Sequence, residues 1–235
     1  RAVYNNIRKF LLYILTSNMS EAAPSAAFLV SRGGIPLPLT VMQILCIDLG
    51  TDMVPALGLG AEPPEGDVME QPPRKRKDRL LNQRIILQGF LWYGMIEVVL
   101  SMAAYFYVNL THGWPHVPLA SSGHVYQMAT TMTLAAIVFC QVGMVLNCRT
   151  SRLSVLKVGI FNNKKILGGI VVEIALICVL SYVPFLHDTF NTAPLALKDW
   201  AMLITLPPLV VIIEEIRKGF TRTYAKRTAE RKATL

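Results

Sequence analysis

Acidic and polar side chains recur at helical spacing in the first apolar stretch of the sequence. Tyr13, Ser17 and Glu21 follow one another at intervals of four residues, and Asn18 lies three residues before Glu21. Residues at these spacings lie near one another on a helix, so all four are expected on one face. Such a face can offer hydroxyl, amide and carboxylate oxygens to a ligand.

The second apolar stretch carries Asp48 and Asp52, again four residues apart, with Thr51 beside them. A carboxylate at the centre of a bilayer costs about 2.5–3.5 kcal/mol on insertion scales. Glu21, Asp48 and Asp52 are therefore expected to face one another or a cation rather than lipid. Neither stretch contains a Lys, Arg or His among these acids.

Prolines in both stretches free backbone oxygens close to the acids. Pro24 cannot donate to the carbonyl of Ser20, and Pro55 cannot donate to that of Thr51, while Gly50 loosens the second helix. Carbonyl and carboxylate oxygens together suit hard cations such as calcium, and broken helices near the midplane are a common transporter device. An alternative stays open, in which these groups only hydrogen-bond one another to specify packing.

Three polar residues stand alone among apolar neighbours in later stretches. Glu97 and Glu173 are single acids, and each is interpreted either as a ligand carboxylate or as a protonated or paired packing residue. Gln141 is a neutral side chain of the kind that more often hydrogen-bonds between membrane helices than binds an ion.

Helices that position these residues are predicted from composition and hydropathy. The chain of 235 residues is 53% hydrophobic and only 16% charged, with a mean hydropathy of +0.43, which is too apolar for an ordinary soluble domain. A bilayer core about 30 Å thick needs roughly 20 apolar residues per helix. The sequence therefore predicts an all-α polytopic bundle of six transmembrane helices, at 10–30, 38–58, 85–110, 128–146, 166–183 and 200–213.

Positive charge is distributed unevenly between the predicted loops. The formal charge is +8, and all of the 23 lysine and arginine residues except Arg32 and Lys198 lie on one predicted side of the membrane. By the positive-inside rule, both termini and the loops at 59–84 and 147–165 are expected in the cytoplasm. The basic run at 74–77 is interpreted as a topogenic loop, so no nucleic-acid partner is expected.

These patterns divide the chain into segments with different expected roles. We predict a cytoplasmic stalk at 1–9, an ion-binding helix pair at 10–58, a cytoplasmic loop at 59–84, four supporting helices at 85–213 and a basic cytoplasmic tail at 214–235.

Three motifs make the sequence similar to a known family. They are the stalk Val-Tyr-Asn-Asn-Ile-Arg-Lys-Phe at 3–10 leading to Leu-Thr-Ser-Asn-Met-Ser-Glu at 15–21, Asp-Leu-Gly-Thr-Asp-Met-Val-Pro at 48–55, and a loop with Glu-Pro-Pro at 62–64, Asp-Val-Met at 67–69 and Pro-Pro-Arg at 72–74. The whole chain resembles the C-terminal half of the membrane domain of type II P-type cation-transporting ATPases, the family of calcium pumps and sodium/potassium pumps. The resemblance implies the last six of ten membrane helices.

Site residues follow from the resemblance residue by residue. It implies that the transported cation is bound by family ligands at Asn18, Glu21, Asp48, Thr51 and Asp52, with Tyr13 and Ser17 lining the site. An earlier helix outside this sequence would supply the rest.

Other positions bear on which cation is transported. Gln141 falls where calcium pumps have a ligand glutamate and sodium/potassium pumps a glutamine. Met144 replaces an aspartate that sodium/potassium pumps associate with a third sodium site, whereas Glu173 matches an acid near that site. Calcium, sodium with potassium counter-transport, and protons therefore all remain open.

The remaining expectations concern activity, partners and location. The sequence contains no Asp-Lys-Thr-Gly, Thr-Gly-Glu-Ser or Gly-x-x-x-x-Gly-Lys motif, so this chain alone is not expected to hydrolyse ATP; the resemblance assigns ATP and magnesium to N-terminal domains of the same protein. We expect an integral protein of a prokaryotic plasma membrane, with the lipid bilayer as partner and no beta subunit. A free-standing cation-binding or cation-conducting module, or the accessory half of a split ATPase, is the alternative.

Overall fold

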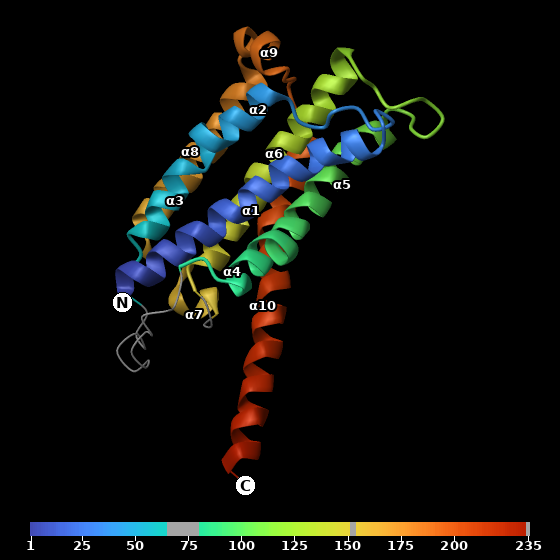
Figure 1. Cartoon of the computed structure of the whole chain (residues 1–235). Helices are drawn as coiled ribbons and strands as arrows, with labels where there is room; N and C mark the ends of the chain where they lie inside the picture. The colour runs from blue at the N-terminus through green and yellow to red at the C-terminus, as the bar shows by residue number, and fades with distance from the viewer. Residues whose placement is uncertain (65–79, 151–153, 234–235) are drawn as a thin grey trace.

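The computed structural model of the protein describes residues 1–64, 80–150 and 154–233, with the side chains of 84 and 224–233 left aside. Within these residues every regular element is helical, and long helices pack side by side in a slanted bundle (Figure 1). In chain order the elements are α1 (Ala2–Val30), α2 (Val41–Cys46), η1 (Ile47–Thr51), α3 (Met53–Gly60), α4 (Gln83–Leu87), η2 (Gln88–Gly94), α5 (Met95–Thr111), α6 (Gly123–Cys148), α7 (Val155–Val158), η3 (Ile160–Asn162), α8 (Lys164–Tyr182), α9 (Pro184–Phe190) and α10 (Leu197–Ala233).

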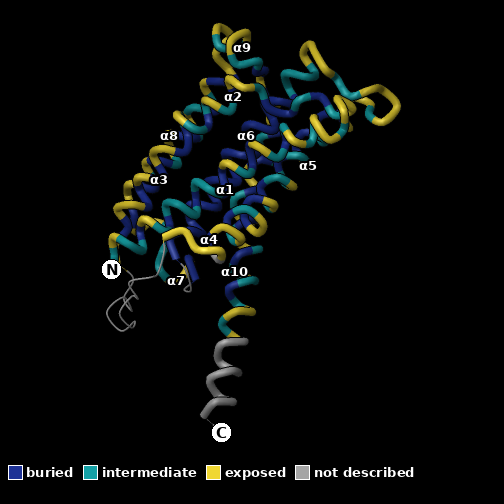
Figure 2. Tube along the Cα trace, in the orientation of Figure 1, coloured by how far each residue is buried: buried dark blue, intermediate teal, exposed yellow. Residues whose placement is uncertain are grey.

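Helix α6 forms the centre of the bundle. Every residue from Ala129 to Cys148 is buried, and α1, α5, α8 and α10 all pack against this helix (Figure 2). An apolar helix that is buried on all sides needs no polar face, which explains why hydrophobic residues on α6 show no preferred side. The polar residues that α6 does carry, including Gln141, are therefore held inside the protein.

Two of the long helices contain a π-helical turn. In the helix formed by α2, η1 and α3, this turn is η1, which includes Asp48, Gly50 and Thr51. There the backbone N–H of Asp52 donates to the carbonyl of Ile47 at 3.0 Å. A π turn inserts one extra residue into the helix and is frequently found at functional sites. The expected loosening around Gly50 thus takes the form of a π turn that contains two of the predicted ligands.

Glycines allow α3 and α8 to approach closely. A Cβ atom added at Gly169 would lie 2.9 Å from the backbone nitrogen of Pro55, and one added at Gly58 would lie 2.9 Å from the Ile166 side chain. Small residues at such contacts are typical of helix pairs in membranes. This contact holds α8, with Glu173, against the helix that carries Asp52.

The structure confirms an all-helical membrane bundle. Among the described residues, four helical segments are long and apolar enough to cross a bilayer: Val41–Gly60, Ile85–Thr111, Gly123–Cys148 and Lys164–Tyr182. The helices α1 and α10 run in the same bundle, and the count of six crossings stays a prediction.

Both termini lie at the same end of the bundle, together with α4 and α7 (Figure 1). An even number of crossings requires this arrangement. The predicted topogenic run at 74–77 lies outside the described residues, and which end faces the cytoplasm stays a prediction.

Candidate cation-binding site

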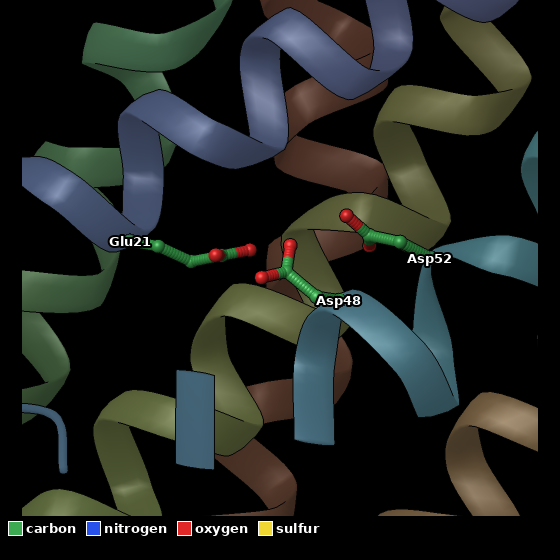
Figure 3. A group of neighbouring side chains, drawn as sticks. All are labelled: Glu21, Asp48 and Asp52. Atoms are coloured by element: carbon green, nitrogen blue, oxygen red, sulfur yellow. The ribbon is translucent and has the colours of Figure 1, made fainter. Parts of the chain in front are cut away.

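Three carboxylates from two helices meet inside the bundle. Glu21 extends from α1 toward Asp48, which lies within η1, and Asp52, which directly follows η1 (Figure 3). One carboxylate oxygen from each residue lies within 4.8 Å of the other two. This separation lets one cation contact all three, because Na⁺ and Ca²⁺ bind oxygen ligands from several directions at once. The arrangement brings together the three acids that the sequence singled out.

Burial makes this cluster costly without a positive charge. The exposed fractions of Glu21 and Asp52 are 4% and 2%, whereas Asp48 is the more exposed member of the group. Across residues 1–64, 80–150 and 154–233, no arginine, lysine or histidine forms an ion pair with any of the three. Buried carboxylates without a counter-charge must take up protons or bind cations.

A chain of hydrogen bonds connects Glu21 to α6. The Nε2 atom of Gln141 donates to the Ser17 hydroxyl at 2.7 Å, and that hydroxyl donates to Oε1 of Glu21 at 2.9 Å. The single proton of the Ser17 hydroxyl is used in the contact to Glu21, and its oxygen accepts from Gln141, so Ser17 links the Glu21 carboxylate to α6. Gln141 therefore contacts the site through Ser17. Its own Oε1 is buried and has no hydrogen-bond partner among the described residues.

Tyr13 lies between Asp52 and a second acid. Its hydroxyl is 3.5 Å from Oδ1 of Asp52 and 3.5 Å from Oε1 of Glu173 on α8. One phenol carries one proton, so it can donate to only one of these carboxylates at a time. Glu173 is completely buried, and its other oxygen has no partner among the described residues. The site thus continues from α3 through Tyr13 to α8.

Thr51 and Asn18 carry neutral oxygens, in contrast to the charged oxygens of the carboxylates. The Thr51 side chain is buried, and its hydroxyl donates to the carbonyl of Ile47 at 3.0 Å, so only its lone pairs remain for a ligand. Asn18 is exposed, unlike Tyr13, Ser17 and Glu21. The expectation that all four share one face is therefore wrong for Asn18, because a residue next to Ser17 is rotated by about 100° around a helix.

Glu97 is a further buried acid, and it is not one of the three carboxylates that meet within 4.8 Å. It lies on α5, its exposed fraction is 0%, and neither of its carboxylate oxygens has a hydrogen-bond partner in the part of the chain that the structure describes. Sequence reasoning singled out Glu97 and the carbonyl of Ser20 but not the Ser20 side chain, which is also completely buried and whose hydroxyl donates to the carbonyl of Ser17 at 2.8 Å. The spacing of three residues between Ser17 and Ser20 could have indicated that both side chains lie near one face of α1.

Comparison with known proteins agrees with this architecture. Residues 36–220 match the family described as Cation transporting ATPase, C-terminus. Over 94% of its length the chain is 33% identical to the sodium/potassium-transporting ATPase subunit alpha-4 of Rattus norvegicus, and over 95% it is 32% identical to the subunit alpha-2 proteins of Gallus gallus and Homo sapiens.

The matched region is a limited part of these relatives. The chain spans 24% of the length of each of them. Together with the apolar helical bundle, the match confirms the resemblance seen in the motifs. The chain belongs to the cation-transporting ATPase C-terminal family and is a C-terminal membrane region of a type II P-type ATPase.

Proposed function

We propose that this chain is the ion-binding membrane part of an ATP-driven cation pump, and that Glu21, Asp48 and Asp52 bind the transported cation. One observation carries the proposal: three carboxylates meet within 4.8 Å, two of them are buried, and no described cationic side chain is paired with them. A cation supplies the missing charge. The proposal extends to sodium or potassium as cargo because the relatives named above are sodium/potassium-transporting ATPase subunits.

Neighbouring groups would complete the coordination. Ser17 and Gln141 hold Glu21 in place, and Pro55, which has no N–H, leaves the carbonyl of Thr51 without its usual helical donor. Asn18 would contribute only if another helix of the full protein covered its exposed side. In the full protein, ATP and magnesium would bind to domains outside this sequence, and α1 would connect those domains to the site.

Cation-stimulated phosphorylation of the complete pump tests this function. The purified protein in lipid is given radiolabelled ATP at increasing Na⁺, and the acid-stable phosphoenzyme is measured. Wild type should show saturable stimulation, and Asp52→Asn should need at least tenfold more Na⁺, which corresponds to about 1.4 kcal/mol. An unchanged Na⁺ dependence in Asp52→Asn would contradict the proposed ligand role.

Flux through liposomes distinguishes the pump from a free-standing conducting module. Vesicles that contain only this chain should show no ATP-independent Na⁺ or K⁺ flux. Flux that is present in wild type and lost in Asp52→Asn would favour the conducting module instead.

A further inference from the structure

Helix α2 leads into the cation site from the end of the bundle opposite to both termini, where it lies beside α9 (Figure 1). It has only six residues, Val41–Cys46, before the π turn η1 that carries Asp48. Gln43 is the one buried residue among these six, with an exposed fraction of 0%, whereas Val41 and Leu45 are exposed. Gln43 is therefore the residue of α2 that can fix this short helix from inside the bundle.

The side-chain amide of Gln43 makes three hydrogen bonds. Its Oε1 accepts from the backbone N–H of Thr40 at 3.1 Å, which fixes the first turn of α2. Its Nε2 donates to the carbonyls of Phe190 and Asn191, at 3.0 and 3.2 Å, where α9 ends. A primary amide has two N–H protons, so its donors match these two acceptors.

The connection from α9 to α10, which supplies these carbonyls, is itself tied to two long helices. The backbone N–H of Ala193 donates to the hydroxyl oxygen of Thr131 on α6 at 2.9 Å. The hydroxyl of Thr192 donates to the carbonyl of Leu180 on α8 at 2.7 Å. Gln43 thus anchors α2 to a segment that α6 and α8 already hold.

This anchor matters because the ion-binding helix is interrupted at the site. In η1 the N–H of Asp52 donates to the carbonyl of Ile47, and Pro55 has no N–H to donate to Thr51. Helices bend and shift at π turns and prolines, so the part beyond the interruption does not fix the part before it. The position of Asp48, at the start of η1, therefore depends on how α2 is held.

We propose that Gln43 is a positioning residue of the cation site, which holds Asp48 opposite Glu21 by anchoring α2 to the connection from α9 to α10. Gln43 itself is not a ligand, because it precedes Asp48 by five residues, or about 7.5 Å along a helix. This inference rests on the proposed cation-binding function and adds a residue that acts through one of its three carboxylates. Loss of the Gln43 amide protons should then weaken cation binding only while Asp48 is a ligand.

A double-mutant cycle with Asp48→Asn tests this role. Gln43→Met removes the amide protons at nearly equal side-chain length, and phosphorylation from ATP is measured against Na⁺ concentration in the complete pump in lipid. Gln43→Met should raise the Na⁺ concentration for half-maximal phosphorylation about tenfold in the wild-type background, but less than about twofold in the Asp48→Asn background. The apparent affinity for ATP should stay unchanged, because ATP binds outside the membrane helices.

The matched control is Thr192→Val, which removes a hydrogen bond of the same connection to α8 and none to α2. Both Thr192→Val and Gln43→Met should lower the unfolding temperature in detergent, but Thr192→Val should leave the Na⁺ dependence of phosphorylation unchanged. Equal shifts of the Na⁺ dependence in the two variants would overturn the proposal. An effect of Gln43→Met as large in the Asp48→Asn background as in wild type would do the same, since both results indicate general loosening.

A second variant keeps the test valid if Gln43→Met does not fold. Gln43→Asn retains the amide protons on a shorter side chain, and monodisperse protein should show a smaller shift with the same dependence on Asp48. A full shift that persists in the Asp48→Asn background would again contradict the positioning role. Failure of the underlying function would look different, because wild type itself would then show no cation-stimulated phosphorylation.

Discussion

Arg149, at the C-terminal end of α6, forms a buried ion pair with Glu62, just after α3. The guanidinium Nη2 lies 2.8 Å from Oε1 of Glu62, and the two side chains are 1% and 4% exposed. Asn163 at the start of α8 donates to the other Glu62 oxygen, and Asn6 of α1 donates to the Glu62 carbonyl at 2.6 Å. One residue thus ties together the ends of α1, α3, α6 and α8 on the side of the bundle where both termini lie.

Removing Arg149 should destabilise the protein strongly. Arg149→Met would leave the Glu62 carboxylate buried and uncompensated, which typically costs about 3–5 kcal/mol of unfolding free energy. Thermal unfolding in detergent measures the effect. The control is Arg222→Met, which removes the partner of Glu215 in a more exposed pair at 3.2 Å and should cost only about 0–1 kcal/mol. Equal losses in the two variants would contradict the importance of burial.

Neutralising either remaining acid of the site should weaken cation binding. Glu21→Gln and Asp48→Asn each remove a ligand charge and should lower the apparent cation affinity by tenfold or more, or at least about 1.4 kcal/mol. The measurement is phosphorylation from ATP as a function of cation concentration in the complete pump. A purely structural role for these acids predicts instead that both variants keep the wild-type affinity.

Loss of the Ser17 hydroxyl should reach the site through Glu21. Ser17→Ala removes the donor to Glu21 and leaves Gln141 without its acceptor. Hydrogen bonds to charged groups contribute about 1.5–3 kcal/mol, so the cation affinity should fall by at least about tenfold. Thr16→Ala is the control, because the Thr16 hydroxyl donates only to the Leu12 carbonyl of its own helix at 2.8 Å. A similar fall in both variants would show that helix packing, not the contact to Glu21, is responsible.

Two adjacent glycines of α8 should respond oppositely to alanine. At Gly169 the added methyl group would meet the backbone of Pro55 at 2.9 Å, so α3 and α8 must separate, at a cost of about 1–3 kcal/mol. At Gly168 nothing lies within 4 Å, and alanine should stabilise the helix by up to about 1 kcal/mol. Unfolding in detergent compares the two variants directly. Destabilisation by Gly168→Ala would show that this face of α8 is covered.

Local patterns account for much of what was predictable. Hydropathy placed two of the helices within five residues of their observed ends: the stretch predicted at 166–183 is observed as Lys164–Tyr182, and that at 128–146 as Gly123–Cys148. The stretch predicted at 200–213 lies inside a much longer helix, Leu197–Ala233. The spacing of Asp48 and Asp52 predicted that both would face the same partner, as they do. These features depend on residues a few positions apart, and helical periodicity alone relates such residues.

Contacts across the bundle could not be predicted in the same way. Tyr13 and Glu173 are 160 residues apart, and Ser17 and Gln141 are 124 apart. Whether these side chains meet depends on the rotation and depth at which α6 and α8 pack against α1. The position of Glu62 opposite Arg149 has the same origin, since these residues follow the ends of α3 and α6, and the relative register of these two helices depends on packing across the bundle.

The sequence by itself determined that this protein is an apolar helical bundle with acids at helical spacing in its first two long helices, because burying apolar surface and carboxylates in a membrane imposes a pattern on every turn. Only the tertiary structure decided which oxygens converge. It brought Glu21 to Asp48 and Asp52, turned Asn18 outward and left Glu97 buried without a hydrogen-bond partner among the described residues. The physical reason is that convergence depends on how helices distant in the sequence pack together, and the period of a single helix carries no information about its neighbours.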